Sequence, residues 1–88
     1  MNFSVEWERD SFDELNKLQG DITKRILEKI DLVKENPIHF IEKLKDMPEF
    51  KIRVGDFRVI LLLDNTNKII KIQAVGHRKN IYKRYKTD

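Results

Sequence analysis

The chain begins with a period-two pattern of apolar and polar residues. Phe3, Val5 and Trp7 alternate with Ser4 and Glu6, and this alternation is typical of a half-buried β-strand. We therefore predict a first strand in this segment.

Helical periodicity follows the first strand. Ser11 and Glu14 stand at capping-box spacing, so a short helix is predicted with Ser11 as its N-cap, and Gly20 is expected to stop it. Asp21 is the expected cap of a second helix, which ends at Asn36 because the following proline disfavours helical backbone in the residue before it. The apolar stripe of this second helix consists of Ile22, Ile26, Leu27, Ile30 and Val33.

The second half of the chain returns to period two after a connector over residues 38–48 that has local helical character. Gly55-Asp56 is expected to form a two-residue hairpin turn, and a second turn is centred on Asn65-Thr66. The predicted strands cover residues 50–54, 57–63 and 69–75, and residues 78–85 are expected to form a short helix or tail.

The predicted elements follow the order β-α-α-β-β-β, with a short C-terminal helix or tail. Two helices that pack on one face of a twisted antiparallel sheet make an α+β fold. A chain of 88 residues has enough apolar side chains for one modest core only, so we expect a single domain over residues 1–88.

Several protein classes are disfavoured by composition. The longest apolar run, from Val59 to Leu63, is far shorter than the roughly 20 residues that a membrane helix needs, and the N-terminus does not resemble a secretory signal. The chain has no cysteine, and His39 and His77 lack acidic companions at metal-ligand spacing. We expect a cytoplasmic protein with no membrane partner, no metal and no cofactor.

Charge is divided unevenly along the chain, although the net charge is only +3. Residues 1–48 contain eight Lys or Arg and eleven Asp or Glu, whereas residues 49–88 contain ten Lys or Arg and four Asp or Glu. Such asymmetry favours a C-terminal half that faces a polyanion, and a solvated basic surface is the alternative reading.

The predicted hairpin turn sorts these charges by face. A two-residue turn at Gly55-Asp56 pairs Arg53 with Arg58 and Lys51 with Ile60 across the two strands. Like charges opposed in this way destabilise a sheet by up to roughly 1 kcal/mol. A bound polyanion would offset that cost, and the alternative reading is that Lys51, Arg53, Arg58 and Lys71 simply form a solvated face of the sheet.

The next turn and the C-terminal segment extend this basic face. A turn centred on Asn65-Thr66 would place Gln73 beside Arg58 and Lys71 beside Ile60. Tyr82 follows Arg78 by one helical turn, which would hold its phenol over the basic residues. Because Ile60 and Leu62 share this face, we expect the C-terminal segment or a partner to cover part of it.

A resemblance to a known family rests on the same residues. The segment Phe50-Lys51-Ile52-Arg53-Val54-Gly55-Asp56-Phe57-Arg58-Val59-Ile60, followed by Val75-Gly76-His77-Arg78 and Tyr82, resembles the C-terminal signature of RelE-type toxins in the RelE/ParE superfamily. The two-helix layout before it, with Lys43-Leu44 and Met47-Pro48, is also similar.

The resemblance implies a toxin that cleaves messenger RNA at the ribosome without a metal, and a cognate antitoxin that wraps it in a hetero-oligomer. Attack of an RNA 2′-hydroxyl on the adjacent phosphate would leave a cyclic phosphate or 3′-phosphate and a 5′-hydroxyl. The family's catalytic positions fall on Lys51, Arg53, Arg58, Arg78 and Tyr82. Further substrate contacts are expected from Lys43, Lys45, Lys71, Gln73, His77 and Lys79.

Roles within the catalytic set follow from side-chain chemistry. Arg58 and Arg78 would bind the scissile phosphate, because guanidinium groups bind phosphate bidentately and stay charged, with Arg53 assisting. Lys51 or Tyr82 would transfer protons. His77 has the better acid–base chemistry, but strand alternation is expected to point it away from Arg78.

Two other functions stay open at this point. A ParE-like toxin that inhibits DNA gyrase would share the fold and lack a nuclease site, and the complete set of basic and tyrosine residues disfavours it. A domain that has lost activity and acts only as a binding module is the second alternative.

Overall fold

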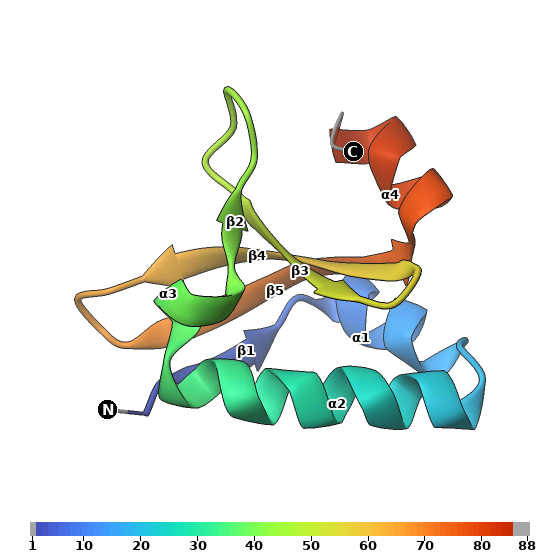
Figure 1. The fold of residues 1–88 in the computed structure, drawn as a ribbon, viewed down its shortest axis with the longest axis horizontal. Helices are drawn as coiled ribbons and strands as arrows, with labels where there is room; N and C mark the ends of the chain where they lie inside the picture. Colours follow the sequence, from blue (N-terminus) through green and yellow to red (C-terminus); the bar gives the residue numbers. More distant parts are fainter. Residues whose placement is uncertain (1, 86–88) are drawn as a thin grey trace.

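The computed structural model describes residues 2–85, which form helices and strands in the arrangement shown in Figure 1. The elements are β1 (Ser4–Trp7), α1 (Arg9–Asn16), α2 (Gly20–Glu35), α3 (Pro37–Phe40), β2 (Glu42–Lys43), β3 (Phe50–Val54), β4 (Phe57–Asp64), β5 (Ile69–His77) and α4 (Arg78–Tyr85). The predicted α+β class and element order are confirmed. No helix within residues 2–85 is long and apolar enough to cross a bilayer.

The five strands form one sheet in the order β1-β5-β4-β3-β2. The pairs β3–β4 and β4–β5 are antiparallel, as expected, and so is the pair β2–β3, whereas β1 runs parallel to β5. The sheet is therefore mixed, because β1 joins its edge beside the last strand of the chain. Strand β2 was not predicted, since two residues are too few to show a period-two pattern.

One face of the sheet carries the main core. Helices α1 and α2 lie against this face, below the sheet in Figure 1. Ile26 and Val33 of α2 are fully buried, because the apolar stripe of the helix packs on the inward side chains of the strands. The strand residues in this core include Ile52, Val59, Leu61, Ile70, Ile72 and Val75.

Both predicted helix caps are wrong. Helix α1 starts earlier than expected, with Glu8 as its N-cap, and Ser11 is buried with its hydroxyl 2.6 Å from Glu8 O and 3.1 Å from Ile72 O. Ser11 therefore faces β5 instead of the helix end. Gly20 is the first residue of α2, and Asp21 lies in its first turn, where its charge still complements the helix dipole.

The β3–β4 hairpin has the predicted register. Its facing residues are Val54 with Phe57, Ile52 with Val59, Arg53 with Arg58, and Lys51 with Ile60. Gly55 has φ +59°, and a Cβ there would lie 2.9 Å from Nη2 of Arg25. Glycine is favoured at this turn by its left-handed backbone conformation, whereas the end of the Arg25 side chain could move aside.

The predicted β4–β5 register is wrong. Arg58 faces Gly76, and Lys71 faces Leu62, not Ile60. Four residues separate the strands, with Lys68 in the left-handed region at φ 57°. A β-bulge between Ile60 and Leu61 then leaves Gln73 without a partner on β4.

A second, smaller core occupies the other face of the sheet. Ile60 and Ala74 are fully buried there beneath Ile81 of α4, and Leu44 of the β2–β3 connection joins them. Figure 1 shows α4 and this connection on the side of the sheet opposite α2. The expectation that the C-terminal segment covers Ile60 is confirmed.

Candidate polyanion-binding site

The basic residues of the hairpin share the face that α4 partly covers. Lys51 and Arg58 are buried, with 4% and 5% of their surface exposed, whereas Arg53 is exposed. Burial of two cations side by side is costly unless polar partners or an anion compensate them. This cluster is therefore the strongest candidate site in the described part of the chain.

Arg58 is held in one orientation by the backbone of its own hairpin. Its Nη1 donates to Gly55 O and Phe57 O, both at 2.8 Å, and its Nη2 donates to the Tyr82 hydroxyl at 3.3 Å. Its Nε is buried without a hydrogen-bond partner. An unsatisfied donor on a buried cation is a defect that proteins retain mainly at functional sites, and an anion would supply the missing acceptor.

Helix α4 brings Tyr82 to this cluster. The Arg78 N–H donates to Asp56 O at 2.9 Å, so the start of the helix is tied to the β3–β4 turn. One turn later the Tyr82 hydroxyl lies next to Arg58. The Arg78 side chain is exposed.

A carboxylate also belongs to this site. Glu42 of β2 faces Lys51 across the strands, and its Oε1 lies 3.3 Å from Nε of Arg53. It offsets part of the repulsion between Arg53 and Arg58. Sequence reasoning missed Glu42 because β2 was not predicted, and the residue was counted only among the acidic positions of the N-terminal half.

The remaining lysines of β2 and the β2–β3 connection lie beside the site. Lys43 Nζ donates to Met47 O and lies 5.8 Å from the centroid of the Phe50 ring, so its contacts support the connection. Lys45 is exposed and lines a hollow of about 530 Å³ together with Asp46, Met47 and Arg84. Lys45 remains available to a ligand that crosses this hollow.

His77 points away from Arg58, as alternation along the strand requires. Its ring packs edge-on against Phe57 at a centroid distance of 5.5 Å, and its Nδ1 accepts the N–H of Lys79 at 3.2 Å. Lys79 is exposed in the first turn of α4. These contacts place His77 outside the cluster.

Lys71 and Gln73 do not reach Arg58, because the β4–β5 register differs from the expected one. Hydrogen bonds from Asn67 hold the pKa of the Asp64 carboxyl below its usual value of 3.8, and the charge of Lys71 contributes further. Lys71 faces Leu62 and lies toward the Asp64 end of the β4–β5 hairpin. Gln73 lines a separate hollow of about 380 Å³ with Glu8, Arg9, Asp10 and Arg84.

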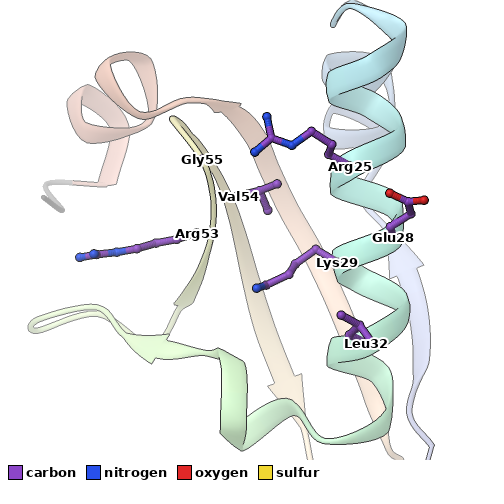
Figure 2. Close-up of a pocket in the computed structure, with 7 residues that line it drawn as sticks. All are labelled: Arg25, Glu28, Lys29, Leu32, Arg53, Val54 and Gly55. Carbon is purple, nitrogen blue, oxygen red and sulfur yellow. The ribbon is translucent and has the colours of Figure 1, made fainter.

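A groove of about 330 Å³ lies between α2 and the β3 end of the hairpin. In Figure 2, Arg25 and Lys29 point from α2 toward β3, whereas Arg53 points away from them. The cations of α2 and those of the candidate site thus lie on different sides of β3. The groove is a neighbouring feature and contributes no side chain other than Arg53 to the site.

The fold and the site together define a class of small α+β proteins in which a C-terminal helix places a tyrosine against a buried arginine on a β-hairpin. The family model for the ParE toxin of the type II toxin–antitoxin system parDE matches residues 5–82. The chain belongs to this RelE/ParE toxin family and is a toxin of a type II toxin–antitoxin system.

Similar proteins agree with this assignment. The curated RelE1 protein of Methanocaldococcus jannaschii is 32% identical, over 94% of this chain and 98% of its own length. RelE in the archaeal RelE–RelB complex from Pyrococcus horikoshii is 27% identical, with a TM-score of 0.75 over 89% of this chain and 97% of that one. The RelBE2 toxin–antitoxin complex from Mycobacterium tuberculosis matches with 21% identity and a TM-score of 0.82, over 89% of this chain and 100% of that one, and supports the fold.

Proposed function

We propose that this toxin is an endoribonuclease that cleaves messenger RNA at the ribosome without a metal. The contact between Arg58 Nη2 and the Tyr82 hydroxyl, above a face that also carries Lys51 and Arg53, is the observation that supports this most strongly. The RNA 2′-hydroxyl attacks the adjacent phosphate, the bond to the 5′-oxygen breaks, and a cyclic phosphate or 3′-phosphate and a 5′-hydroxyl remain.

Phosphate stabilisation falls to the arginines. Arg58 is fixed by two backbone carbonyls, so it needs no reorganisation when negative charge develops on the phosphate oxygens. Arg78 is exposed and can close on the phosphate bidentately from solvent. Arg53 adds positive charge from the strand beside Arg58.

Proton transfer has three candidate groups. Lys51 and Tyr82 were expected from the sequence, and the structure adds Glu42, which faces Lys51. The carboxylate of Glu42 carries oxygens that can accept the 2′-hydroxyl proton, whereas lysine and tyrosine side chains carry protons that they can donate. Glu42 is therefore our preferred base, and Tyr82 or Lys51 the proton donor to the leaving 5′-oxygen.

A cognate antitoxin is the expected partner. The similar toxins from Pyrococcus horikoshii and Mycobacterium tuberculosis were solved as complexes with their antitoxins. The exposed basic residues of the site make an acidic segment of such a partner the natural ligand when RNA is absent.

Inhibition of DNA gyrase is the second candidate function. It is favoured by one finding, namely that the family model that matches residues 5–82 is the one for ParE toxins. The complete set of Lys51, Arg53, Arg58, Arg78 and Tyr82 disfavours it, because a toxin that only binds another protein does not need a nuclease site.

Arg78→Ala tests the nuclease. Because Arg78 is exposed and its backbone N–H bond to Asp56 is retained in the variant, the fold should persist, and cleavage in translating extracts should fall at least about 100-fold with loss of toxicity. Mapping of message 5′ ends after induction gives the rate and position of cleavage. Lys24→Ala, on the exposed side of α2, is the control.

Three outcomes separate the readings. Breaks inside translated codons that disappear in Arg78→Ala support the nuclease. Breaks that are undiminished in Arg78→Ala overturn the assignment of the site. DNA damage with intact messages overturns the nuclease and supports the gyrase reading.

A further inference from the structure

The edge of β5 changes its partner halfway along its length. Strand β1 pairs with β5 only as far as Trp7, which faces Ile72. Beyond that point α1 takes over the edge: Glu8 N–H donates to Ile72 O at 2.9 Å, and Glu14 Oε1 accepts the N–H of Val75 at 3.0 Å. A side chain of α1 therefore satisfies a backbone group that a strand would otherwise satisfy.

The same carboxylate also binds α4. Oε2 of Glu14 lies 2.6 Å from Nη1 of Arg84, and the two side chains are only 27% and 45% exposed. Glu14 thus joins three elements that are far apart in sequence: α1, β5 and α4. The contact is charge-assisted, which strengthens it, although it lies at the surface, where ion pairs contribute modestly.

Helix α4 has three further anchors among the described residues. Its start is tied by the Arg78 N–H to Asp56 O, Ile81 is fully buried, and Tyr85 at its end packs against the smaller core. Tyr82 follows Ile81 directly. The 3.3 Å contact between its hydroxyl and Arg58 depends on where this turn of the helix lies. A fixed second turn of α4 is therefore a condition for that contact.

We propose that Glu14 is a positioning residue of the toxin: through Arg84 it fixes the second turn of α4 and so keeps the Tyr82 hydroxyl against Arg58. The proposal rests on the proposed nuclease function for its catalytic consequence, although the placement of α4 can be measured without any RNA. The competing reading is that Glu14 only closes the edge of β5.

The two contacts of Glu14 can be separated by substitution. Glu14→Gln keeps an oxygen that can accept the Val75 N–H but loses the charge that binds Arg84. Arg84→Gln removes the same ion pair from the other side, and Arg84→Lys retains its charge. Asp13→Asn and Lys83→Gln, at exposed neighbouring positions, are the matched controls.

Amide hydrogen exchange on the free toxin is the first measurement. In Glu14→Gln and in Arg84→Gln, the amides of the second turn of α4 should exchange about tenfold faster than in the wild type. The Val75 amide should remain protected in both. The double variant should be no worse than either single variant, since one interaction is removed in all three. Unchanged exchange of the α4 amides would overturn the proposal.

Cleavage at saturating ribosome concentration is the second measurement. Both Gln variants should lower kcat and leave KM unchanged, and Arg84→Lys should restore most of the loss. A faster α4 exchange with unchanged kcat would reject the positioning role while the nuclease stands. If the wild type cuts no message, the proposed function fails, and the exchange data still decide whether Glu14 holds α4.

Discussion

The two faces of the sheet use the same strands for different purposes. The face under α1 and α2 buries a continuous apolar core, whereas the face under α4 buries only Leu44, Ile60, Ala74 and Ile81 and shares its area with Lys51 and Arg58. Because side chains alternate along a strand, one hairpin can serve the fold on one side and a charged site on the other. The smaller core leaves room for the charges and holds α4 with fewer contacts.

The largest effect on stability should come from the main core. Ile26 is fully buried in α2, so Ile26→Ala should lower the free energy of unfolding by about 2 to 5 kcal/mol. Urea unfolding followed by the fluorescence of Trp7 measures it. Leu27→Ala, at a neighbouring position that is 42% exposed, should cost clearly less, and equal losses would contradict the placement of Ile26 in the main core.

A smaller global effect is expected from the core under α4. Ile81 is buried nearly as deeply as Ile26, but it belongs to the smaller core. We therefore expect α4 to detach while the main core stays folded, so the global loss in Ile81→Ala should stay below about 2 kcal/mol. The amides of α4 should lose protection, and message cleavage should fall with them. A global loss as large as that of Ile26→Ala would show that the two cores unfold as one unit.

The smallest effect concerns pH. Partial burial raises the pKa of the Tyr85 phenol above its usual value of 10.0, with a smaller contribution in the same direction from Glu49. The folded state therefore favours the neutral phenol. This preference stabilises the fold fully at pH values below the pKa of Tyr85 in the unfolded chain, and the stabilisation is lost as the pH rises through the pKa in the folded chain. In the Tyr82→Phe variant, Tyr85 is the only tyrosine. Its phenolate absorbance should appear at a higher pH in the folded protein than in the unfolded chain. Trp7 fluorescence should not change over that range.

The β3–β4 hairpin could be predicted because a single local rule decides it. The turn at Gly55-Asp56 fixes the pairing, and alternation then places Lys51, Arg53 and Arg58 on one face. The β4–β5 pairing could not be predicted in this way. A four-residue loop and a bulge opposite Ile60 and Leu61 shift the register, and neither has a distinct sequence signature.

The carboxylates of the site region escaped prediction for a different reason. Glu42 acts through a two-residue strand, and Glu14, which the capping-box spacing assigned to a local role, makes its contacts with Val75 and Arg84. Both depend on segments that are far away in sequence. Periodicity identifies the face on which a residue lies, but it does not identify distant elements that pack there.

The bulge in β5 has a consequence for the length of the chain. Gln73 has no partner on β4, while Ile72 faces Leu61 and Ala74 faces Ile60 on either side of it. Omission of Gln73 would leave these pairs and both faces unchanged, whereas omission of Ile72 would move an amide side chain into the main core. Within β5, Gln73 is thus the residue whose deletion would keep every other side chain of the strand on the face of the sheet that it now occupies.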